Sequence, residues 1–381
     1  MPECLARHHR TGIPWRLAWE GGRLTALHPV PRARARPGLV LAPGLCDIQV
    51  NGWAGRDFRD AVSVAAVARD LASFGVARFL PTVTTADPVE MERALAAIAA
   101  AAAASPKLAA AIPGIHLEGP YISPLDGPRG AHPRAFVRDP DWGHFQGLQR
   151  AAGGRIRLVT LAPELPGAAA FTAEATAAGI TVAIGHTAAD ADAVAGVLAA
   201  GARLSTHLGN GLAAELQRHR NPIWPQLAAE GLWASLIADG HHLPPEVLRA
   251  IVRAKGPSRC ILVSDSVREA GLPPGRHTGL GGAPVDVLPD GRIQVPGTPY
   301  LAGSGAHLLH CAALAAEWFG EAEALEMASV HPARLLGLPA GGIGAGDALL
   351  LRTGPEWSAL LLARGGAIVH EAPGAAQVEA V

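Results

Sequence analysis

The chain has 381 residues, of which 49% are hydrophobic, and this is ample material for a large globular core. Its 32 basic and 33 acidic residues give a formal charge of −1, so no overall field attracts nucleic acid or an anionic membrane. Any anionic ligand must therefore be held by local groups.

The expected location is the cytoplasm. Charged residues near the start leave no room for the apolar segment of a signal peptide: Glu3, Arg7, Arg10, Arg16 and Glu20. The uncharged run 295–316 is broken by prolines and glycines, which argues against a membrane span. Four cysteines are scattered without a CxxC spacing, which suits buried thiols in a reducing compartment.

Both ends of the chain have short strand-like pieces. From Trp15 to about Leu41, apolar pieces alternate with turn signals such as Glu20-Gly-Gly22. Similar pieces return near the C-terminus, within 346–370. We therefore expect residues 1–42 and 337–381 to pair in one small β domain, which flanks a larger domain of residues 43–336.

Eight apolar runs follow, each ending in a polar or turn residue. They are Leu45–Gln49, Ala77–Thr82, Ala111–Glu118, Ile156–Ala162, Thr181–His186, Arg203–His207, Trp233–Asp239 and Arg259–Asp265. Helical stretches rich in Ala and Leu separate most of them, and the clearest begins with Asp87 as N-cap and Pro88 at the first helical position. The alternation predicts an α/β fold, a (β/α)8 TIM-like barrel whose reactive groups gather at the C-terminal strand ends.

A doubly wound open sheet is the weaker alternative, because no Gly-rich phosphate loop follows the first strand. The barrel would close by pairing its first strand with its eighth. After the eighth run, a Gly/Pro-rich segment at 271–304 is expected to form a lid or hairpin outside the barrel.

Three of the strand ends carry metal-ligand chemistry. Glu118 ends the third run and precedes Gly119-Pro120, which cannot continue a central strand. His186 and His207 end the fifth and sixth runs. One carboxylate and two imidazoles form the His2Glu set that leaves a fourth position on zinc open for water. Each residue alone would be a solvated or locally bonded side chain, whereas three at barrel strand ends favour a metal site.

Asp265, at the end of the eighth run, would lie near the bound metal without being a ligand. A carboxylate there can take the proton of an attacking water and return it to a departing amine. The alternative is that Asp265 only caps the following segment. Either His132 or His242 could donate to the developing oxyanion.

Nine ordered motifs between Pro43 and about Ala333 resemble those of the N-acetylglucosamine-6-phosphate deacetylase family, in the amidohydrolase superfamily. They are Pro43-Gly-Leu-Cys-Asp-Ile-Gln-Val-Asn-Gly52, Pro81-Thr-Val-Thr-Thr85, Gly114 to Pro120, Gly130-Ala-His132, Gly185-His186, Thr206-His207-Leu, Ala238-Asp-Gly-His-His242, Ser264-Asp265 and Leu301-Ala-Gly-Ser304. The resemblance implies a metal-dependent barrel with a β-sandwich built from both termini, a homodimer, and release of acetate from a small amino-sugar substrate.

The same resemblance implies roles for individual residues. Glu118, His186 and His207 would be metal ligands, and Asp265 would be the general base and then acid. His242 would polarise the acetyl carbonyl and His132 would contact the sugar. The phosphate would be held through the side chain of Asn210 and the backbone of Gly211, with an arginine further along completing the pocket, often from the neighbouring subunit.

The first strand bears on the number of metal ions. Many superfamily members have His-x-His there and hold two metals bridged by a carbamylated lysine, but this chain has Gln49-Val-Asn51. Its two lysines, Lys107 and Lys255, lie outside the expected strand ends. We therefore expect one divalent metal ion per subunit, most simply Zn²⁺, with Fe²⁺, Co²⁺ or Mn²⁺ as alternatives.

The chain departs from the family pattern around the phosphate. Arg218 and Arg220 are both candidates for the phosphate arginine, and Arg220 is preferred because Asn221-Pro222 follows it like the family's turn. Two alternatives to the phosphorylated substrate stay open: a deacetylase or deacylase of the same architecture for an unphosphorylated or different N-acyl compound, and a barrel that binds a sugar without catalysis.

Overall fold

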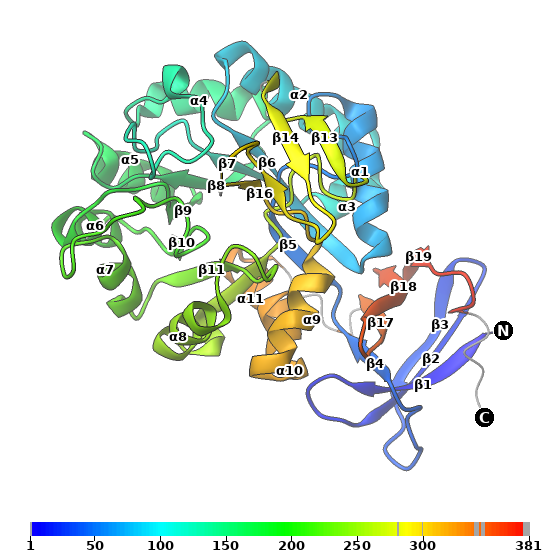
Figure 1. Ribbon diagram of the computed structural model, residues 1–381. Helices are drawn as coiled ribbons and strands as arrows, with labels where there is room; N and C mark the ends of the chain where they lie inside the picture. Colours follow the sequence, from blue (N-terminus) through cyan, green and yellow to red (C-terminus); the bar gives the residue numbers. More distant parts are fainter. Residues whose placement is uncertain (1, 280–281, 299, 339–342, 344–346, 376–381) are drawn as a thin grey trace.

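The computed structural model describes residues 2–279, 282–298, 300–338, 343 and 347–375 (Figure 1). Parts of the expected C-terminal segment of the small domain, including residues 339–342 and 376–381, lie outside these described residues.

Eight parallel strands form the central sheet, and each pairs with its neighbours in chain order. They are β5 (Leu45–Val50), β6 (Val76–Thr84), β7 (Ile115–Glu118), β8 (Ile156–Leu161), β9 (Thr181–Ile184), β10 (Leu204–Ser205), β11 (Trp233–Ile237) and β12 (Cys260–Val263). This confirms the (β/α)8 barrel. Several strands are shorter than the apolar runs: Ala111 ends a helix, and β10 is only two residues long.

The barrel closes at a seam between the second half of β5 with the residue after it and the segment just beyond β12. Asp265 N donates to Gln49 O at 3.0 Å, and Asn51 N donates to Ser266 O at 2.8 Å. Asp47, fully buried on β5, accepts the Ser264 N–H at 3.2 Å. The first and eighth strands therefore meet at the level where the reactive residues are found.

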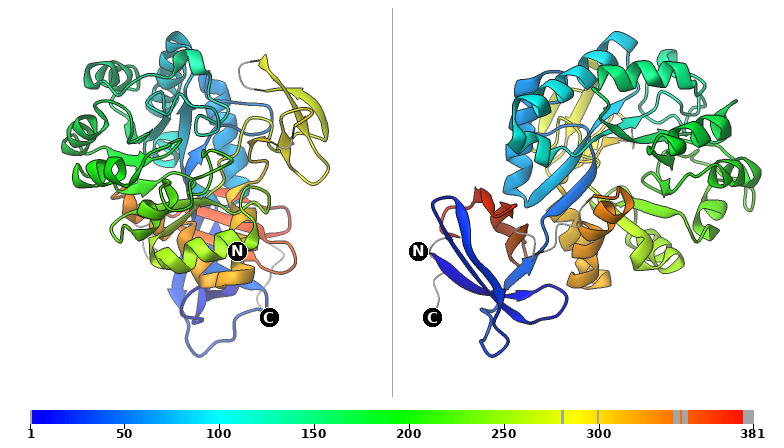
Figure 2. Two further views of the ribbon diagram at one scale, coloured as in Figure 1. Left: turned by 60° about the vertical axis from the view of Figure 1, so that its left-hand side comes forward. Right: turned by 180° about the vertical axis from the view of Figure 1, so that it is seen from behind.

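Helices surround the sheet as the alternation predicts (Figures 1 and 2). They are α1 (Ala61–Ser73), α2 (Pro88–Ala104), α3 (Pro106–Ala111), α4 (Trp142–Ala151), α5 (Ala168–Ala177), α6 (Ala191–Ala199), α7 (Ile223–Ala228), α8 (Pro245–Lys255), α9 (Leu308–Phe319), α10 (Glu321–Met327) and α11 (Val330–Leu335). Asp87 caps α2 by accepting the Val89 N–H at 2.9 Å. None of the helices within the described ranges is long and apolar enough to cross a membrane.

The core is divided between the inside and the outside of the barrel. An inner cluster contains Ile48, Leu80, Leu158 and Ile261 from four strands, together with Leu335 of α11. A larger cluster lies between the strands and the outer helices. Burial on both faces explains why the strands are continuous apolar runs rather than alternating ones.

The two ends of the chain contribute to a second, smaller sheet beside the barrel, where Figure 2 shows blue N-terminal strands next to red C-terminal ones. Its strands are β1 (Glu3–His8), β2 (Pro14–Glu20), β3 (Arg23–Pro29), β4 (Leu39–Ala42), β17 (Ala348–Arg352), β18 (Ser358–Arg364) and β19 (Ala367–Glu371). They close in the order β1-β2-β3-β19-β18-β17-β4. The expected pairing of the two ends in a small β domain is present, and its strands form one closed sheet.

The Gly/Pro-rich segment forms an antiparallel sheet of its own. Its strands are β13 (Gly275–Thr278), β14 (Pro284–Val287), β15 (Ile293–Gln294) and β16 (Leu301–Gly303). It returns to the barrel at Ser304, whose N–H donates to Asp265 O at 3.3 Å while its carbonyl accepts Val267 N–H at 3.1 Å. The excursion is thus attached directly to the segment that carries Asp265.

Candidate metal centre and active site

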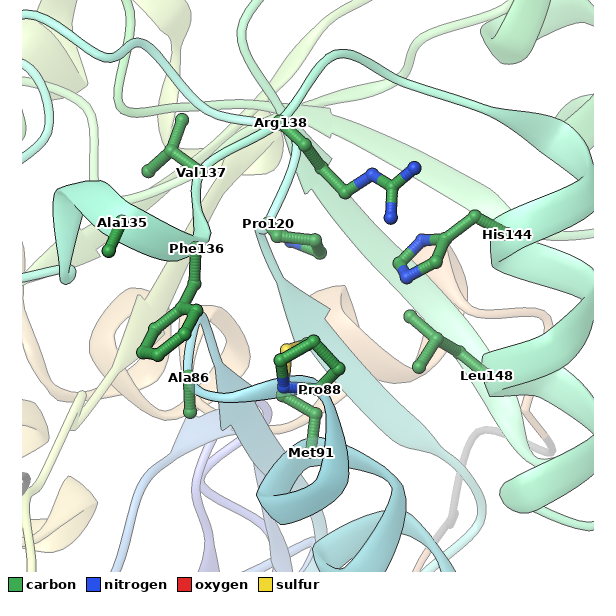
Figure 3. A pocket seen from close by; sticks show the side chains of 10 residues that line it. All are labelled: Ala86, Pro88, Met91, Pro120, Ala135, Phe136, Val137, Arg138, His144 and Leu148. Atoms are coloured by element: carbon green, nitrogen blue, oxygen red, sulfur yellow. The ribbon is translucent and has the colours of Figure 1, made fainter.

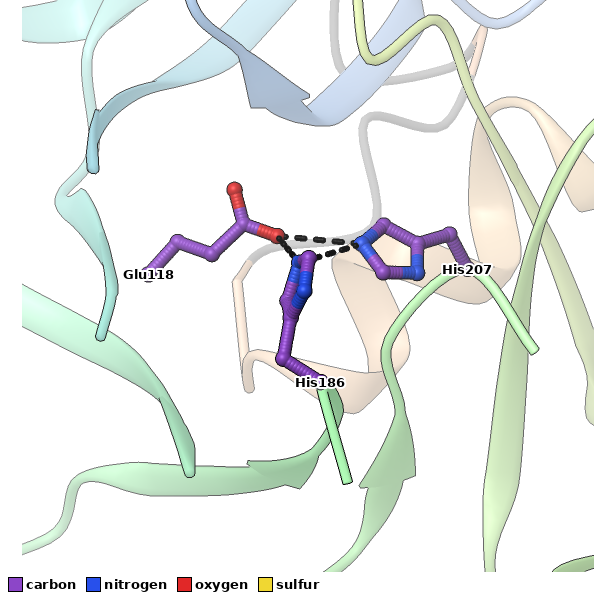
Figure 4. Close-up of side chains that lie close together, drawn as sticks. All are labelled: Glu118, His186 and His207. Carbon is purple, nitrogen blue, oxygen red and sulfur yellow. Dashed lines mark hydrogen bonds and ion pairs between the residues drawn. The ribbon is translucent and has the colours of Figure 1, made fainter. Parts of the chain in front are cut away.

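The three ligands predicted from the sequence converge on one point (Figure 4). Glu118 Oε1 lies 3.1 Å from His207 Nε2 and 3.2 Å from His186 Nε2, and the two Nε2 atoms are 3.2 Å apart. All three residues are buried. They come from the ends of β7, β9 and β10, which only the tertiary fold brings together.

The backbone at these positions is unusual. His186, His207 and Asp265 have φ values of +51°, +31° and +48°, and each lies two residues beyond the last residue of its strand. Such left-handed conformations cost a non-glycine residue on the order of 1–3 kcal/mol. The chain keeps them because they turn it sharply out of the strand while the side chain stays at the barrel mouth. Strain repeated at three strand ends indicates a functional constraint.

The donor set fits a divalent metal ion. His186 Nδ1 donates to Pro128 O at 2.9 Å, so with a metal bound the ring would present the lone pair of Nε2 to the centre. Burial raises the pKa of Glu118, but the hydrogen bonds and charges of His186 and His207 outweigh burial and hold this pKa well below its ordinary value. An ionised carboxylate and two imidazole nitrogens, buried and facing each other, can hold a metal.

Two amides of β5 and its extension complete the centre. Gln49 Nε2 donates to Glu118 Oε1 at 2.8 Å, and Asn51 Nδ2 donates to Asp265 Oδ1 at 2.8 Å. The sequence showed only that these residues stand where other superfamily members have histidines. Their contacts with Glu118 and Asp265 are information that the structure adds.

Asp265 is buried beside this cluster. Burial and the charge of Glu118 raise the pKa of its carboxyl to about 7, against the lowering effect of His207, His242 and Asn51. A carboxyl group that titrates near neutrality can both accept and return a proton.

His242 has a carboxylate partner that sequence reasoning did not assign. Its Nδ1 donates to Asp239 Oδ2 at 2.7 Å, while Asp239 Oδ1 accepts the N–H groups of His241 and His242, each at 2.9 Å. Burial lowers the pKa of His242, but the hydrogen bond and charge of Asp239 outweigh burial and raise it overall. The available signal was the spacing Asp-x-x-His at a strand end.

His132 packs against the ring of His186. Their ring centroids are 4.4 Å apart in an edge-to-face arrangement, and His132 Nδ1 is hydrogen-bonded to Thr85 Oγ1 at 2.9 Å. Burial, followed by the charge of His186, lowers the pKa of His132 to about 3, so this ring is neutral. His132 is therefore next to the three candidate metal ligands. Its partner Thr85 belongs to one of the motifs found in the sequence, but no role was assigned to it there.

The predicted phosphate residues are spread more widely. Asn210 Nδ2 donates to His207 O at 3.3 Å, and Gly211 has φ +61° with its Cα packed so closely that an added Cβ would lie 3.0 Å from His186 Nδ1. Arg218 and Arg220 are exposed, and neither guanidinium makes an ion pair with any residue that the structure describes. Contacts thus join Asn210 and Gly211 to the ligand histidines, whereas no described contact joins either arginine side chain to the centre.

A cavity of about 240 Å³ lies between the start of α2, the turn Arg134–Phe136 and α4 (Figure 3). Pro120, Arg138 and His144 contribute to its wall. None of the site residues predicted from the sequence lines it. The convergence of reactive groups, rather than this cavity, marks the candidate active site.

Known proteins resemble this chain over most of its length. It is 40% identical over 318 residues to N-acetylglucosamine-6-phosphate deacetylase of Homo sapiens, covering 79% of this chain and 75% of the relative. It is 31% identical over 322 residues to N-acetylgalactosamine-6-phosphate deacetylase of Escherichia coli O157:H7, covering 83% and 84%. The crystal structure of the N-acetyl-D-glucosamine-6-phosphate deacetylase of Mycobacterium smegmatis superposes with a TM-score of 0.85 at 30% identity, covering 97% and 100%. No family model matches the chain.

Proposed function

This chain belongs to the N-acetylglucosamine-6-phosphate deacetylase family, and we propose that it hydrolyses N-acetylglucosamine 6-phosphate to glucosamine 6-phosphate and acetate. The observation that carries the proposal is the convergence of Glu118, His186 and His207 beside Asp265 at the barrel mouth. Those side chains supply a metal-binding group and a proton carrier, the two parts that metal-assisted amide hydrolysis needs.

Glu118 Oε1 and the Nε2 atoms of His186 and His207 would hold the metal ion. When bound, a divalent metal supplies Lewis acidity, which lowers the pKa of water and polarises a carbonyl. One metal per subunit is supported by the amides of Gln49 on β5 and of Asn51 just beyond it, which already donate to Glu118 and Asp265. Zn²⁺ is the first choice for a His2Glu set, with Fe²⁺, Co²⁺ and Mn²⁺ as alternatives.

Asp265 is proposed as the proton carrier. Its carboxylate takes the proton of the attacking water and then gives it to the sugar nitrogen as the C–N bond breaks, so one group serves as base and then as acid. The raised pKa of this buried carboxyl supports both roles. Asn51 holds Oδ1 of the carboxylate by its 2.8 Å hydrogen bond, and Oδ2, which has no hydrogen-bond partner among the described residues, would face the water.

The remaining residues would bind and orient the substrate. His242 donates toward the acetyl carbonyl oxygen, and neutral His132 contacts the sugar hydroxyls. Asn210, the Gly211 backbone and Arg220 are proposed to hold the phosphate, for which a guanidinium is well suited. Because the Arg220 side chain is exposed, it would either turn toward the phosphate when substrate binds or reach the phosphate bound in a neighbouring subunit.

We also propose that the protein is a homodimer in the cytoplasm. The dimer follows from the family resemblance. In a dimer, Arg220 of one subunit could bind the phosphate of a substrate held by the other subunit. All four cysteines are free and buried, which fits a reducing compartment.

A different N-acyl substrate is the second candidate. The exposed positions of Arg218 and Arg220 favour an unphosphorylated substrate. The similarity to an N-acetylgalactosamine-6-phosphate deacetylase favours a different amino sugar. A barrel that only binds a sugar would not need a proton carrier such as Asp265 beside three metal ligands, so this alternative is the least favoured.

Acetate release by the metal-supplemented protein tests these alternatives. We expect the highest kcat/KM with N-acetylglucosamine 6-phosphate, a lower value with N-acetylgalactosamine 6-phosphate and a much lower one with N-acetylglucosamine. Equal rates with and without the phosphate would refute the phosphate requirement. No acetate from any of the three substrates would refute the deacetylase.

A further inference from the structure

His242 and Asp239 form a fixed pair at the end of β11. Asp239 is buried, and its Oδ1 is anchored by the two backbone N–H groups of His241 and His242. Its Oδ2 then lies 2.7 Å from His242 Nδ1. Gly240, with φ +82°, allows the tight turn that folds His242 back onto the carboxylate.

This geometry decides where the proton of His242 is. A carboxylate can only accept, so Nδ1 of His242 must carry a hydrogen. Nε2 is left without a hydrogen-bond partner among the described residues. It can donate to a substrate oxygen only if the ring carries a second proton, and a neighbouring carboxylate favours that charged form.

We propose that Asp239 is a positioning residue: it fixes the orientation of His242 by holding its Nδ1–H, and it keeps the doubly protonated ring a hydrogen-bond donor toward the acyl oxygen of the substrate. The proposal rests on the function proposed above, because it assigns the acyl oxygen as the acceptor. It goes further by assigning an essential role to a carboxylate that touches neither metal ligands nor substrate.

Charges from three parts of the fold face this pair. Asp265, beyond β12, adds to the effect of Asp239 in raising the pKa of His242. His310 of α9 feels the charge of Asp239, the backbone N–H of the neighbouring His241 donates to Asp239, and burial of Asp239 opposes its ionisation. Burial raises the pKa of Asp239, but the hydrogen bond and charge of the His242 ring, together with the backbone N–H groups of His241 and His242, outweigh burial and lower this pKa overall.

A purely structural role for Asp239 is the competing explanation, since its Oδ1 caps the turn. Asp239→Asn separates the two roles. The amide oxygen can still accept the backbone N–H groups, so the turn is kept while the negative charge beside Nδ1 is lost. Asp290→Asn is the matched control, because Asp290 is an exposed aspartate whose carbonyl contacts His241.

The experiment combines kinetics with nuclear magnetic resonance on the metal-loaded full-length protein. Asp239→Asn should lower kcat roughly 10- to 100-fold with a smaller change in KM. It should also move the alkaline limb of the pH–rate profile, where His242 loses its proton, to lower pH by about one unit. Asp290→Asn should change neither.

Two further measurements separate positioning from general destabilisation. His242→Gln should be as slow as the double variant Asp239→Asn/His242→Gln, because Asp239 acts only through His242. Ring ¹⁵N signals of His242, assigned by their loss in His242→Gln, should show protonated Nδ1 in the wild type and a lower pKa in Asp239→Asn. Multiplicative losses in the double variant, or an unchanged His242 titration, would overturn the proposal.

The resonance measurement needs no turnover, so it distinguishes the two levels of inference. A wild-type protein that releases no acetate but shows the expected His242 titration would refute the proposed function and keep the Asp239–His242 coupling. If the wild type releases acetate but the titration of His242 is unchanged in Asp239→Asn, the proposed function is kept and the Asp239–His242 coupling is refuted.

Discussion

Gln49 Nε2 donates a 2.8 Å hydrogen bond to Glu118 Oε1, the same oxygen that faces the two histidine nitrogens. This contact links the first barrel strand to the third across the barrel mouth. The amide thus orients the carboxylate at a position where other superfamily members place a metal-binding histidine. Loss of this hydrogen bond should therefore weaken metal binding.

We expect Gln49→Ala to weaken metal affinity roughly 10- to 100-fold, which is the usual cost of removing a group that orients a ligand. Competition with a chelator measures the dissociation constant directly. Gln146→Ala, at an exposed position on α4, is the control and should bind metal like the wild type. Unchanged affinity in Gln49→Ala would show that Glu118 needs no such support.

Asp265→Asn should lower kcat for acetate release by roughly 10²- to 10⁴-fold, because the amide cannot carry the proton. Metal content, measured by elemental analysis, should stay at the wild-type level, because Asp265 is not proposed as a ligand. Asp139→Asn, exposed in the loop before α4, is the control. Normal acetate release from Asp265→Asn would remove Asp265 from its role.

The same carboxylate sets the acid limb of the pH profile. The base must be ionised, so kcat/KM should fall as the pH is lowered through the pKa of Asp265. This pKa is raised to about 7 without a metal, and a bound cation favours the ionised form. The acid limb of the metal-loaded enzyme should therefore lie below pH 7, and it should be absent from the residual rate of Asp265→Asn.

Asp47 should make stability depend on pH. Burial raises the pKa of its carboxyl from 3.8 to about 7, so the folded protein holds a proton that the unfolded chain has lost. From the lower to the higher of these values, the free energy of unfolding should fall by about 1.4 kcal/mol per pH unit. Below pH 3.8 the contribution of Asp47 to the free energy of unfolding is fully present, and above about pH 7 it is lost.

Denaturant titrations at several pH values test this effect. Asp47→Asn carries no ionisable group, so its stability relative to the wild type should improve as the pH rises through that range. Asp87→Asn, an exposed helix cap, is the control and should show a constant difference. A constant difference for Asp47→Asn as well would mean that Asp47 is ionised in the folded protein.

Gly211→Ala should weaken metal binding. The new Cβ would lie 3.0 Å from His186 Nδ1, which displaces a ligand ring, and φ +61° adds backbone strain. Gly179→Ala is a matched control, because it has φ +77° but nothing within 4 Å of its added Cβ. Both variants should lose stability in thermal unfolding, whereas only Gly211→Ala should lose metal affinity. Equal affinities would show that the ring can move aside.

Arg220→Gln should raise KM for N-acetylglucosamine 6-phosphate roughly 10- to 100-fold, the value of one or two hydrogen bonds to a charged group. The rate with unphosphorylated N-acetylglucosamine should not change, because no phosphate is present. Arg218→Gln, two positions away and equally exposed, is the comparison. If Arg218→Gln alone raises KM, the phosphate arginine is Arg218.

Strand ends could be located from the sequence because they are local features. Apolar runs that stop at Glu118, His186 and His207 indicated both the barrel and the ligand set, since parallel strands in a barrel bring their C-terminal ends together. The boundaries were less accurate. His186, His207 and Asp265 lie two residues beyond their strands, in left-handed conformations that residue type alone does not predict.

The sequence by itself thus determined the fold class and the three side chains that can hold a metal, because these depend on periodicity and on which residue ends each strand. The family was indicated by the resemblance of nine ordered motifs. Only the tertiary structure decided that Gln49 supports Glu118, that Asp239 holds His242 and that Arg220 stays exposed. The first of these contacts joins separate strands, and the second depends on how a turn folds back. The packing of the closed barrel sets the first contact, and the spacing Asp-x-x-His permits the second without fixing the conformation of its turn.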